Sequence, residues 1–278
     1  MTISTIDGLV NALGNNSSRV VIDKASLSNT VAGQFHSLWR ATGQPGQGAI
    51  PAAVANCNNS LTGGMQFTQQ TSPATTYAAY LDAVCSNSAV TLELHDRLMH
   101  MGGLSGTVTT AQTAGVDLNG VTADNMVARI GDSNYSDCQW WLEWYTDTGA
   151  TAATATVAVT YNDGTTGNIT GISLAATRRA SFLQPLNGLI PAAAAGKYIR
   201  AVNTVTLSVT TGTAGNFGVT VTRPRVSLGC PVANIKWSAD WAALPLGEIP
   251  NSACMFPLII AGSTTTGTIR GSVKLAHG

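Results

Sequence analysis

Ionised side chains are scarce in this sequence. Its 278 residues include 14 Lys and Arg and 14 Asp and Glu, so charged residues make up 10% of the chain, against roughly 25% in a typical soluble domain. The formal net charge is zero, which excludes the basic footprint of a protein that binds nucleic acid or an anionic membrane. We expect neither partner. Thr, Ser, Asn, Gly and Ala must build most of the surface, which suits a protein that packs against copies or partners.

Motifs for catalysis and ligand binding are also lacking. The sequence contains no GxSxG, Walker A, GxGxxG, HExxH or EF-hand pattern, so we expect no enzyme, no cofactor and no metal. A Cys–His pair formed by folding stays open. The five cysteines are widely spaced without a CxxC pair, and we expect small buried hydrophobic residues of a protein made in a reducing cytoplasm, with one or two disulfides left open. They are Cys57, Cys85, Cys138, Cys230 and Cys254.

Long apolar runs are missing as well. No uninterrupted apolar run reaches the length of about 18 residues that indicates a membrane span. The opening MTISTIDGLVNALG has no basic segment followed by a continuous apolar core, so we expect no secretory signal.

Helical spacing of apolar residues marks the first half of the chain. Residues 2–13 predict a short helix capped by Thr5, a second helix is expected to end at Ala41, and 75–101 gives the best helical signal, broken near Ser86–Ser88. Between them, residues 43–73 are rich in Gly, Pro, Asn and Gln and predict an extended arm, either ordered on a neighbouring subunit or a mobile linker. Residues 1–130 are therefore expected to form a helix-rich region.

The segment LELHDRLMH within the third helix carries four titratable residues: Glu93, His95, Asp96 and His100. A metal or general-base site is one interpretation. The two histidines are five residues apart and would point about 140° apart on a helix, unlike the i, i+4 pair of a zinc site. We favour a solvated charged face.

Alternation of small polar and β-branched residues begins near Cys138. It predicts strands at roughly 138–147, 153–162, 167–175, 178–184, 197–211 and 216–228, and MFPLIIAG and GTIRGSVKLA predict two more. The turn Asn162–Gly164 is typical of a hairpin. Residues 131–278 therefore predict an antiparallel, jelly-roll-like β-sandwich, and the whole chain an α+β fold.

Six aromatic residues are candidates for an interface. Trp140, Trp141, Trp144 and Tyr145 supply large apolar anchors that the Thr- and Ala-rich strands lack, while Trp237 and Trp241 at i, i+4 predict a short helix around 239–244. The first four rings could alternatively form a sugar-stacking platform, although strand alternation would split them between two faces.

The segments QWWLEWYTDTGATAATATVAVTYNDGTTG and IRAVNTVTLSVTTGTAGNFGVTVTRPR, within a low-charge Ala/Thr/Gly-rich chain, resemble virion structural proteins of tailed bacteriophages. The chain is most similar in style to capsid decoration or cement proteins. The resemblance implies a homo-oligomer, with a trimer favoured, that is made in the host bacterial cytoplasm and binds the major capsid protein or adjoining virion proteins. The alternatives are a carbohydrate-binding, lectin-like protein or a tail, neck or head-fibre component.

Overall fold

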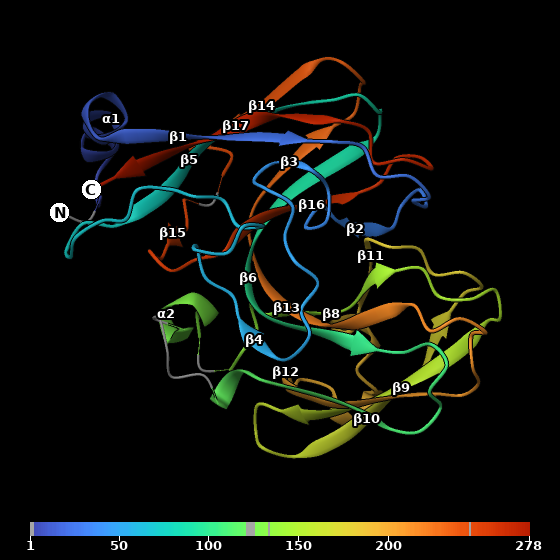
Figure 1. Cartoon of the computed structure of the whole chain (residues 1–278). Helices are drawn as coiled ribbons and strands as arrows, with labels where there is room; N and C mark the ends of the chain where they lie inside the picture. Colours follow the sequence, from blue (N-terminus) through green and yellow to red (C-terminus); the bar gives the residue numbers. More distant parts are fainter. Residues whose placement is uncertain (1–2, 121–125, 133, 245) are drawn as a thin grey trace. The chain divides into compact units, whose positions relative to one another are not determined.

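Strands dominate the computed structural model, which describes residues 3–120, 126–132, 134–244 and 246–278 (Figure 1). Its helices, within those ranges, are α1 (Ile6–Asn15), α2 (Met126–Ile130) and the short 3-10 turns η1 (Leu118–Gly120), η2 (Asn187–Leu189) and η3 (Ala192–Ala194). The expected α+β fold with a helix-rich region over 1–130 is therefore wrong. The described part of the chain is a β protein.

The chain forms two compact units that are interleaved along the sequence. The first unit comprises residues 1–49, 58–96 and 224–278, and the second comprises 50–57 and 97–223. The expected division between residues 130 and 131 falls inside the second unit, where α2 ends. Strands β6 (Val90–Leu104) and β13 (Asn216–Cys230) each contribute to both units.

One antiparallel sheet of the first unit has the strand order β14-β5-β17-β1-β3, with β15 also paired to β5. These strands are β1 (Ser17–Lys24), β3 (Gly43–Gln44), β5 (Thr76–Cys85), β14 (Lys236–Asp240), β15 (Glu248–Ile249) and β17 (Ile269–His277). Strand β17, near the end of the chain, lies between β1 and β5 (Figure 1). We call this the β1 sheet.

A second layer of the first unit contains β16 (Met255–Ile260), which pairs with β2 (Phe35–Ser37) and with the first part of β6. The core between the layers joins side chains of the β1 sheet, such as Ile22 and Leu81, to side chains of β6 and β16, such as Leu94 and Ile259. Helix α1 packs Leu9 and Ala12 against a small separate cluster. The unit is thus a β-sandwich with one helix at its side.

The second unit is also a sandwich. One sheet has the order β10-β9-β12-β7, and in the other layer β8 pairs with β11 and with β13, while β4 pairs with β6. The strands are β4 (Ala55–Asn56), β7 (Gln112–Asp117), β8 (Gln139–Thr146), β9 (Ala153–Tyr161), β10 (Thr166–Leu174), β11 (Phe182–Pro185) and β12 (Ile199–Leu207). One continuous apolar core fills this unit.

The strands predicted from Cys138 onward are confirmed. Strands β8 to β13 begin and end within a few residues of the expected ranges, apart from a shorter β11, and β16 and β17 occupy the last two predicted segments. The hairpin turn also lies where expected, because the N–H of Tyr161 donates to the carbonyl of Thr165 at 2.8 Å and Gly164 adopts a φ of 82°. The alternation of small polar and β-branched residues was most reliable for β9 and β10, which bury one face more than the other.

Three of the predicted helices are wrong. The segment expected to end at Ala41 contains the short strand β2, residues 75–101 form β5 and most of β6, and Trp237 lies in β14. Almost every residue of β6 is buried. A strand that is covered on both faces loses its alternation and can imitate the spacing of a helix. The first prediction holds, since α1 begins after its N-cap Thr5, and the helical turn expected in ADNMVARIGDSNYSDC is present as α2.

The extended arm, residues 43–73, contacts its own chain at several points. The N–H of Met65 donates to the carbonyl of Met255 at 2.7 Å, and the side chain of Asn251 exchanges hydrogen bonds with the backbone of Gln70 at 2.9 and 2.7 Å. The end of the arm is therefore held within the first unit, and a contact between the arm and a neighbouring subunit stays a prediction.

Candidate functional site

The four aromatic residues of β8 lie inside their own subunit. Trp140, Trp141, Trp144 and Tyr145 expose 0%, 1%, 1% and 3% of their surface. The rings of Trp144 and Phe217 stack with centroids 5.3 Å apart and planes 13° apart. A ring that its own subunit covers offers no surface to a partner or to a sugar. The structure therefore places these four predicted interface residues in the core.

Both faces of β8 are covered, which explains why alternation does not expose any of these rings. The indole N–H of Trp140 donates to the carbonyl of Ile199 at 2.8 Å. The indole N–H of Trp141, on the opposite face, donates to Oγ1 of Thr222 at 2.9 Å. Buried indoles need such partners, so the two tryptophans are held in place within the second unit.

Trp237 and Trp241 are half-buried at the surface of the first unit. Trp237 extends from β14 and packs against the core of the sandwich, and its indole N–H donates to the carbonyl of Val232 at 3.4 Å. Trp241 packs beside Leu9 and Ala12. Part of each ring stays accessible, so an interface role for these two residues remains a prediction.

The second unit contains a buried polar cluster of Arg97, His100, Glu143, Tyr145 and Thr220. Arg97 Nη2 lies 2.7 Å from Glu143 Oε1, and Arg97 Nη1 lies 3.1 Å from Nδ1 of His100. The other carboxylate oxygen accepts hydrogen bonds from Tyr145 at 3.1 Å and from Thr220. These contacts join β6, β8 and β13.

Burial sets the charge of this cluster. Desolvation, reinforced by the neighbouring guanidinium of Arg97, lowers the pKa of His100 to about 3, so the imidazole is neutral at neutral pH. Desolvation and the charge of Glu143 raise the pKa of Tyr145, which stays protonated. One positive and one negative charge therefore face each other. The five residues are at most 5% exposed, so a substrate has no access to the cluster.

The sequence interpretation of the LELHDRLMH segment as a solvated helical face is wrong. His95, Asp96 and His100 lie buried on strand β6, and Glu93 pairs with His95 at 2.8 Å. Asp96 lies 3.3 Å from Arg225 and accepts from the N–H of Cys254 at 2.9 Å. In the described ranges, no group of three or more His, Cys, Asp or Glu residues could hold a metal ion. The five cysteines are free and buried, as expected.

A candidate binding site lies at the edge of the β1 sheet. Strand β1 pairs with β17 along its whole length, but β3 covers only Asp23 and Lys24. The buried ammonium of Lys24 donates to the carbonyls of Ala41 and Pro45 at 2.9 and 2.6 Å and so fixes the loop that carries β3. Within the described ranges, no strand pairs with the other side of β1 before Asp23.

The direction of the backbone groups at this edge follows from two hydrogen bonds. The carbonyl of Asn16 accepts from the N–H of His277 on the β17 side, and the N–H of Ala25 donates to the carbonyl of Thr42 on the β3 side. Backbone groups alternate along a strand, so the even-numbered residues of β1 bond to β17. The N–H and C=O groups of the odd-numbered residues, up to residue 21, point to the open edge.

A groove of about 810 Å³ runs beside this open edge. Its walls are uncharged apart from one residue; they come from β1, from β3 and its loop, and from the arm. The lining residues are Arg19, Val20, Val21, Gln44, Pro45, Gly46, Ser60, Thr62, Gly64, Met65 and Gln66.

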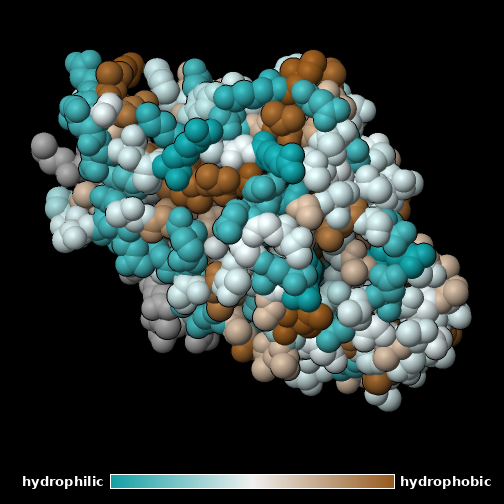
Figure 2. Space-filling view, turned by 45° about the horizontal axis from the view of Figure 1, so that its top comes forward, coloured by the Kyte–Doolittle hydropathy of each residue, from teal (hydrophilic) through white to brown (hydrophobic). Residues whose placement is uncertain are grey.

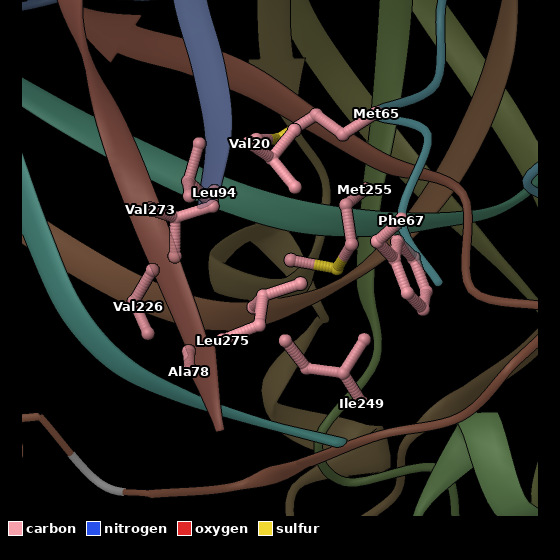
Figure 3. Close-up of a pocket in the computed structure, with 10 residues that line it drawn as sticks. All are labelled: Val20, Met65, Phe67, Ala78, Leu94, Val226, Ile249, Met255, Val273 and Leu275. Atoms are coloured by element: carbon pink, nitrogen blue, oxygen red, sulfur yellow. The ribbon is translucent and has the colours of Figure 1, made fainter. Parts of the chain in front are cut away.

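Val20 and Met65 also line a small apolar cavity inside the sandwich (Figure 3). The cavity measures about 10 Å³, which is about the space of one water molecule. Figure 3 shows Met65, Phe67 and Met255 pointing toward the same space. The inner side of the groove is therefore apolar and backed by flexible methionine side chains.

On the face drawn in Figure 2, apolar residues form separate patches among residues of intermediate and polar hydropathy. Val21 on β1 is 55% exposed, and Ile6 and Val10 on α1 are also exposed. Within the described ranges, no helix is long and apolar enough to cross a membrane.

Comparisons with known proteins do not identify a family for this chain. No family model matches the chain, and no curated protein matches it. Among solved structures, it aligns with the VP2 subviral particle of infectious bursal disease virus at 11% identity, over 94% of this chain and 79% of that chain, with a TM-score of 0.17. The Gt strain of the same virus aligns at 13% identity, over 94% and 80%, with a TM-score of 0.17. These values do not establish a shared fold.

Proposed function

We propose that this chain is a structural, non-catalytic protein of a virus particle. Its partners are copies of itself and neighbouring virion proteins, and we place it in the virion after synthesis in the host cytoplasm. The finer proposal is decoration or cementing of a tailed-bacteriophage capsid through binding to the major capsid protein. This finer proposal rests on the resemblance in sequence style, since the aligned solved structures come from a different virus.

A charge-poor surface is the observation that carries the proposal. The chain has only 28 charged residues, from 14 basic and 14 acidic, and seven of them are buried among the described residues: Lys24, Asp82, Asp96, Arg97, Arg129, Glu143 and Arg225. Surface charge keeps proteins soluble and apart. A surface with so little of it favours association with other protein surfaces.

Several of the remaining charges neutralise each other on the surface. Arg179 pairs with Asp147 at 2.6 Å, Lys197 with Asp163 at 2.8 Å, and each such exposed pair contributes little to stability. Covering a paired charge with an uncharged surface leaves no isolated charge without its counter-ion. The surface is thus suited to close packing with uncharged neighbours.

Light scattering coupled to size-exclusion chromatography tests this proposal. The purified chain is measured alone and after mixing with empty capsid shells from the same source. We expect a symmetric oligomer, a trimer for a decoration protein, and co-elution with the shells. A monomer that elutes apart from shells, tails and other particle parts at every concentration would count against a structural virion role.

A further inference from the structure

One side of strand β1 has backbone groups that no neighbouring strand pairs with in the described part of the chain. Ser17, Arg19 and Val21 direct their backbone N–H and C=O groups away from β17, and β3 begins only opposite Asp23. Unpaired strand edges are templates for another strand, and proteins usually cover or block them. Here the space beside the edge is a groove and not a covering element.

We propose that this groove binds an extended segment of a partner polypeptide, which adds to the β1 sheet as an antiparallel strand beside Ser17–Val21. The inference rests on the proposed function and names the kind of contact that joins this protein to its neighbour. The segment spans five residues of β1, or roughly 17 Å. Main-chain hydrogen bonds supply the affinity, and alternate side-chain positions supply the selectivity.

The inner side of the groove specifies an apolar residue in the partner. Val20 points inward from β1, is half-buried, and lies with Met65 at the apolar cavity. A partner residue opposite Val20 faces the same way, since directly opposed residues share a face of the sheet. Val, Ile or Thr at that position would pack on Val20 and Met65.

The outer side of the groove specifies an acidic residue. Arg19 stands opposite Lys274 in the β1 sheet, and its side chain is 66% exposed. Arg19 Nε donates to Oγ of Ser272 at 2.7 Å. Its Nη2 lies 3.7 Å from Asp82, a carboxylate that lies 3.0 Å from Lys236. Lys274 donates to a backbone carbonyl at the end of α1 at 2.9 Å. Asp82 is thus shared between Arg19 and Lys236, and a partner Asp or Glu opposite Arg19 would add negative charge beside an exposed guanidinium.

A second copy of this chain is less suited to the edge. If two β1 strands paired antiparallel about Arg19, the two Arg19 side chains would face each other, and directly opposed like charges are destabilising. A pairing centred on Val21 would place residues of the second copy where Gln44 already pairs with Asp23. A pairing centred on Ser18 would place Asn16 opposite Val20 and Ser17 opposite Arg19, so it supplies neither the apolar nor the acidic residue. A different polypeptide therefore suits the edge better.

Amide hydrogen exchange on the full-length protein tests the inference. In the free chain, the amides of Ser18, Val20 and Ile22 should exchange slowly and those of Arg19 and Val21 quickly. The probe is the acetylated and amidated peptide TTVEVTT. In an extended strand its two Val side chains face the sandwich core and its central Glu faces solvent. At saturation we expect exchange at Arg19 and Val21 to slow by at least about tenfold, with little change at the even-numbered amides.

Two matched controls sharpen the result. The peptide TTVKVTT differs only in its central charge and should bind about twofold to fivefold more weakly. Val21→Pro removes one outward N–H while leaving the β17 side intact, and it should abolish binding, whereas Val21→Thr retains the N–H and should bind. If the proline variant does not fold, the exchange data on the unmodified chain still decide the question.

Three outcomes would overturn the inference. One is the absence of protection at Arg19 and Val21 at millimolar TTVEVTT, and another is equal binding of the lysine peptide. The third is protection that rises with protein concentration alone, which would assign the edge to a second copy. Failure of the proposed function is separate, since it would appear as absence of the unmodified chain from purified particles whatever the peptide does.

Discussion

At the scale of single residues, this protein places several of its few charges where water is excluded. Arg97 and Glu143 form a buried ion pair at 2.7 Å, and Lys24 is satisfied by backbone carbonyls. Removing one member of such a pair costs several kcal/mol because the other is left uncompensated. These residues therefore fix strand positions.

The neutral, buried state of His100 predicts acid sensitivity. Its pKa is lowered to about 3 in the folded chain from 6.5, so between these pH values the unfolded chain holds more protons. The contribution of the neutral His100 to the free energy of unfolding is therefore fully present above about pH 6.5. It is lost as the pH falls below that value, by up to about 1.4 kcal/mol per pH unit. His100→Gln, which keeps an acceptor for Arg97, should reduce this slope.

Urea unfolding at several pH values between about 4.5 and 7 measures the effect. The pKa values of His95 and His277 are also lowered by burial, so a slope should remain in the variant. Equal slopes for the two proteins would show that His100 does not stay neutral in the fold.

At the scale of elements, how well the sequence predicted a strand depended on its environment. Strands β9 and β10 carry the alternation of one exposed and one buried face, and their positions were predictable. Strands β5 and β6 are buried on nearly all positions and were mistaken for helices. The aromatic run of β8 was located correctly as a strand, but its burial on both faces depends on contacts with β11 and β13 that no local pattern reveals.

The open edge could not be found from the sequence for a similar reason. Its strand, residues 17–24, follows a correctly predicted helix, but the alternation there is short and polar. Which side of β1 stays unpaired depends on β17, more than 240 residues later in the chain. Only the tertiary pairing shows that β3 covers two residues and leaves the rest open.

Substitution of Gly43 tests whether the fold requires the close approach of β3 to β1. It adopts a φ of 118°, and a Cβ added there would lie 1.8 Å from the carbonyl oxygen of Asp23. Gly43→Ala should therefore destabilise the protein by about 1–3 kcal/mol, because the side chain forces β3 away from β1. Denaturant unfolding measures the change.

Gly14→Ala is the matched control. Gly14 lies in α1, and an added Cβ meets nothing within 4 Å. Alanine in a helix should stabilise the chain by about 0.5–1 kcal/mol. If both variants shift stability in the same direction by similar amounts, the close approach of β3 to β1 is not required for folding.

At the scale of the whole molecule, the two sandwich units are drawn from alternating parts of the chain. The first unit needs residues from both ends, since β17 lies between β5 and β1 in the β1 sheet. A sandwich that loses a central strand exposes its core and two new edges. The interleaving thus ties the stability of the first unit to the full length of the chain.

Cutting the chain between residues 130 and 131 should therefore destroy folding in both pieces. The fragment 1–130 lacks β17, and the fragment 131–278 lacks β1, β5 and β6. Near-ultraviolet circular dichroism during heating should show no cooperative transition for either fragment, while the intact chain shows one. Cooperative unfolding of an isolated fragment would contradict the interleaved arrangement.

Quantitative mass spectrometry of purified virus particles, from cells that express this chain together with its neighbouring virion genes, tests the central claim most directly. The account predicts that the chain bands with the particles at a fixed molar ratio to the major capsid protein, and that the ratio survives repeated density-gradient purification. A chain that stays in the soluble fraction while complete particles form without it would contradict the account.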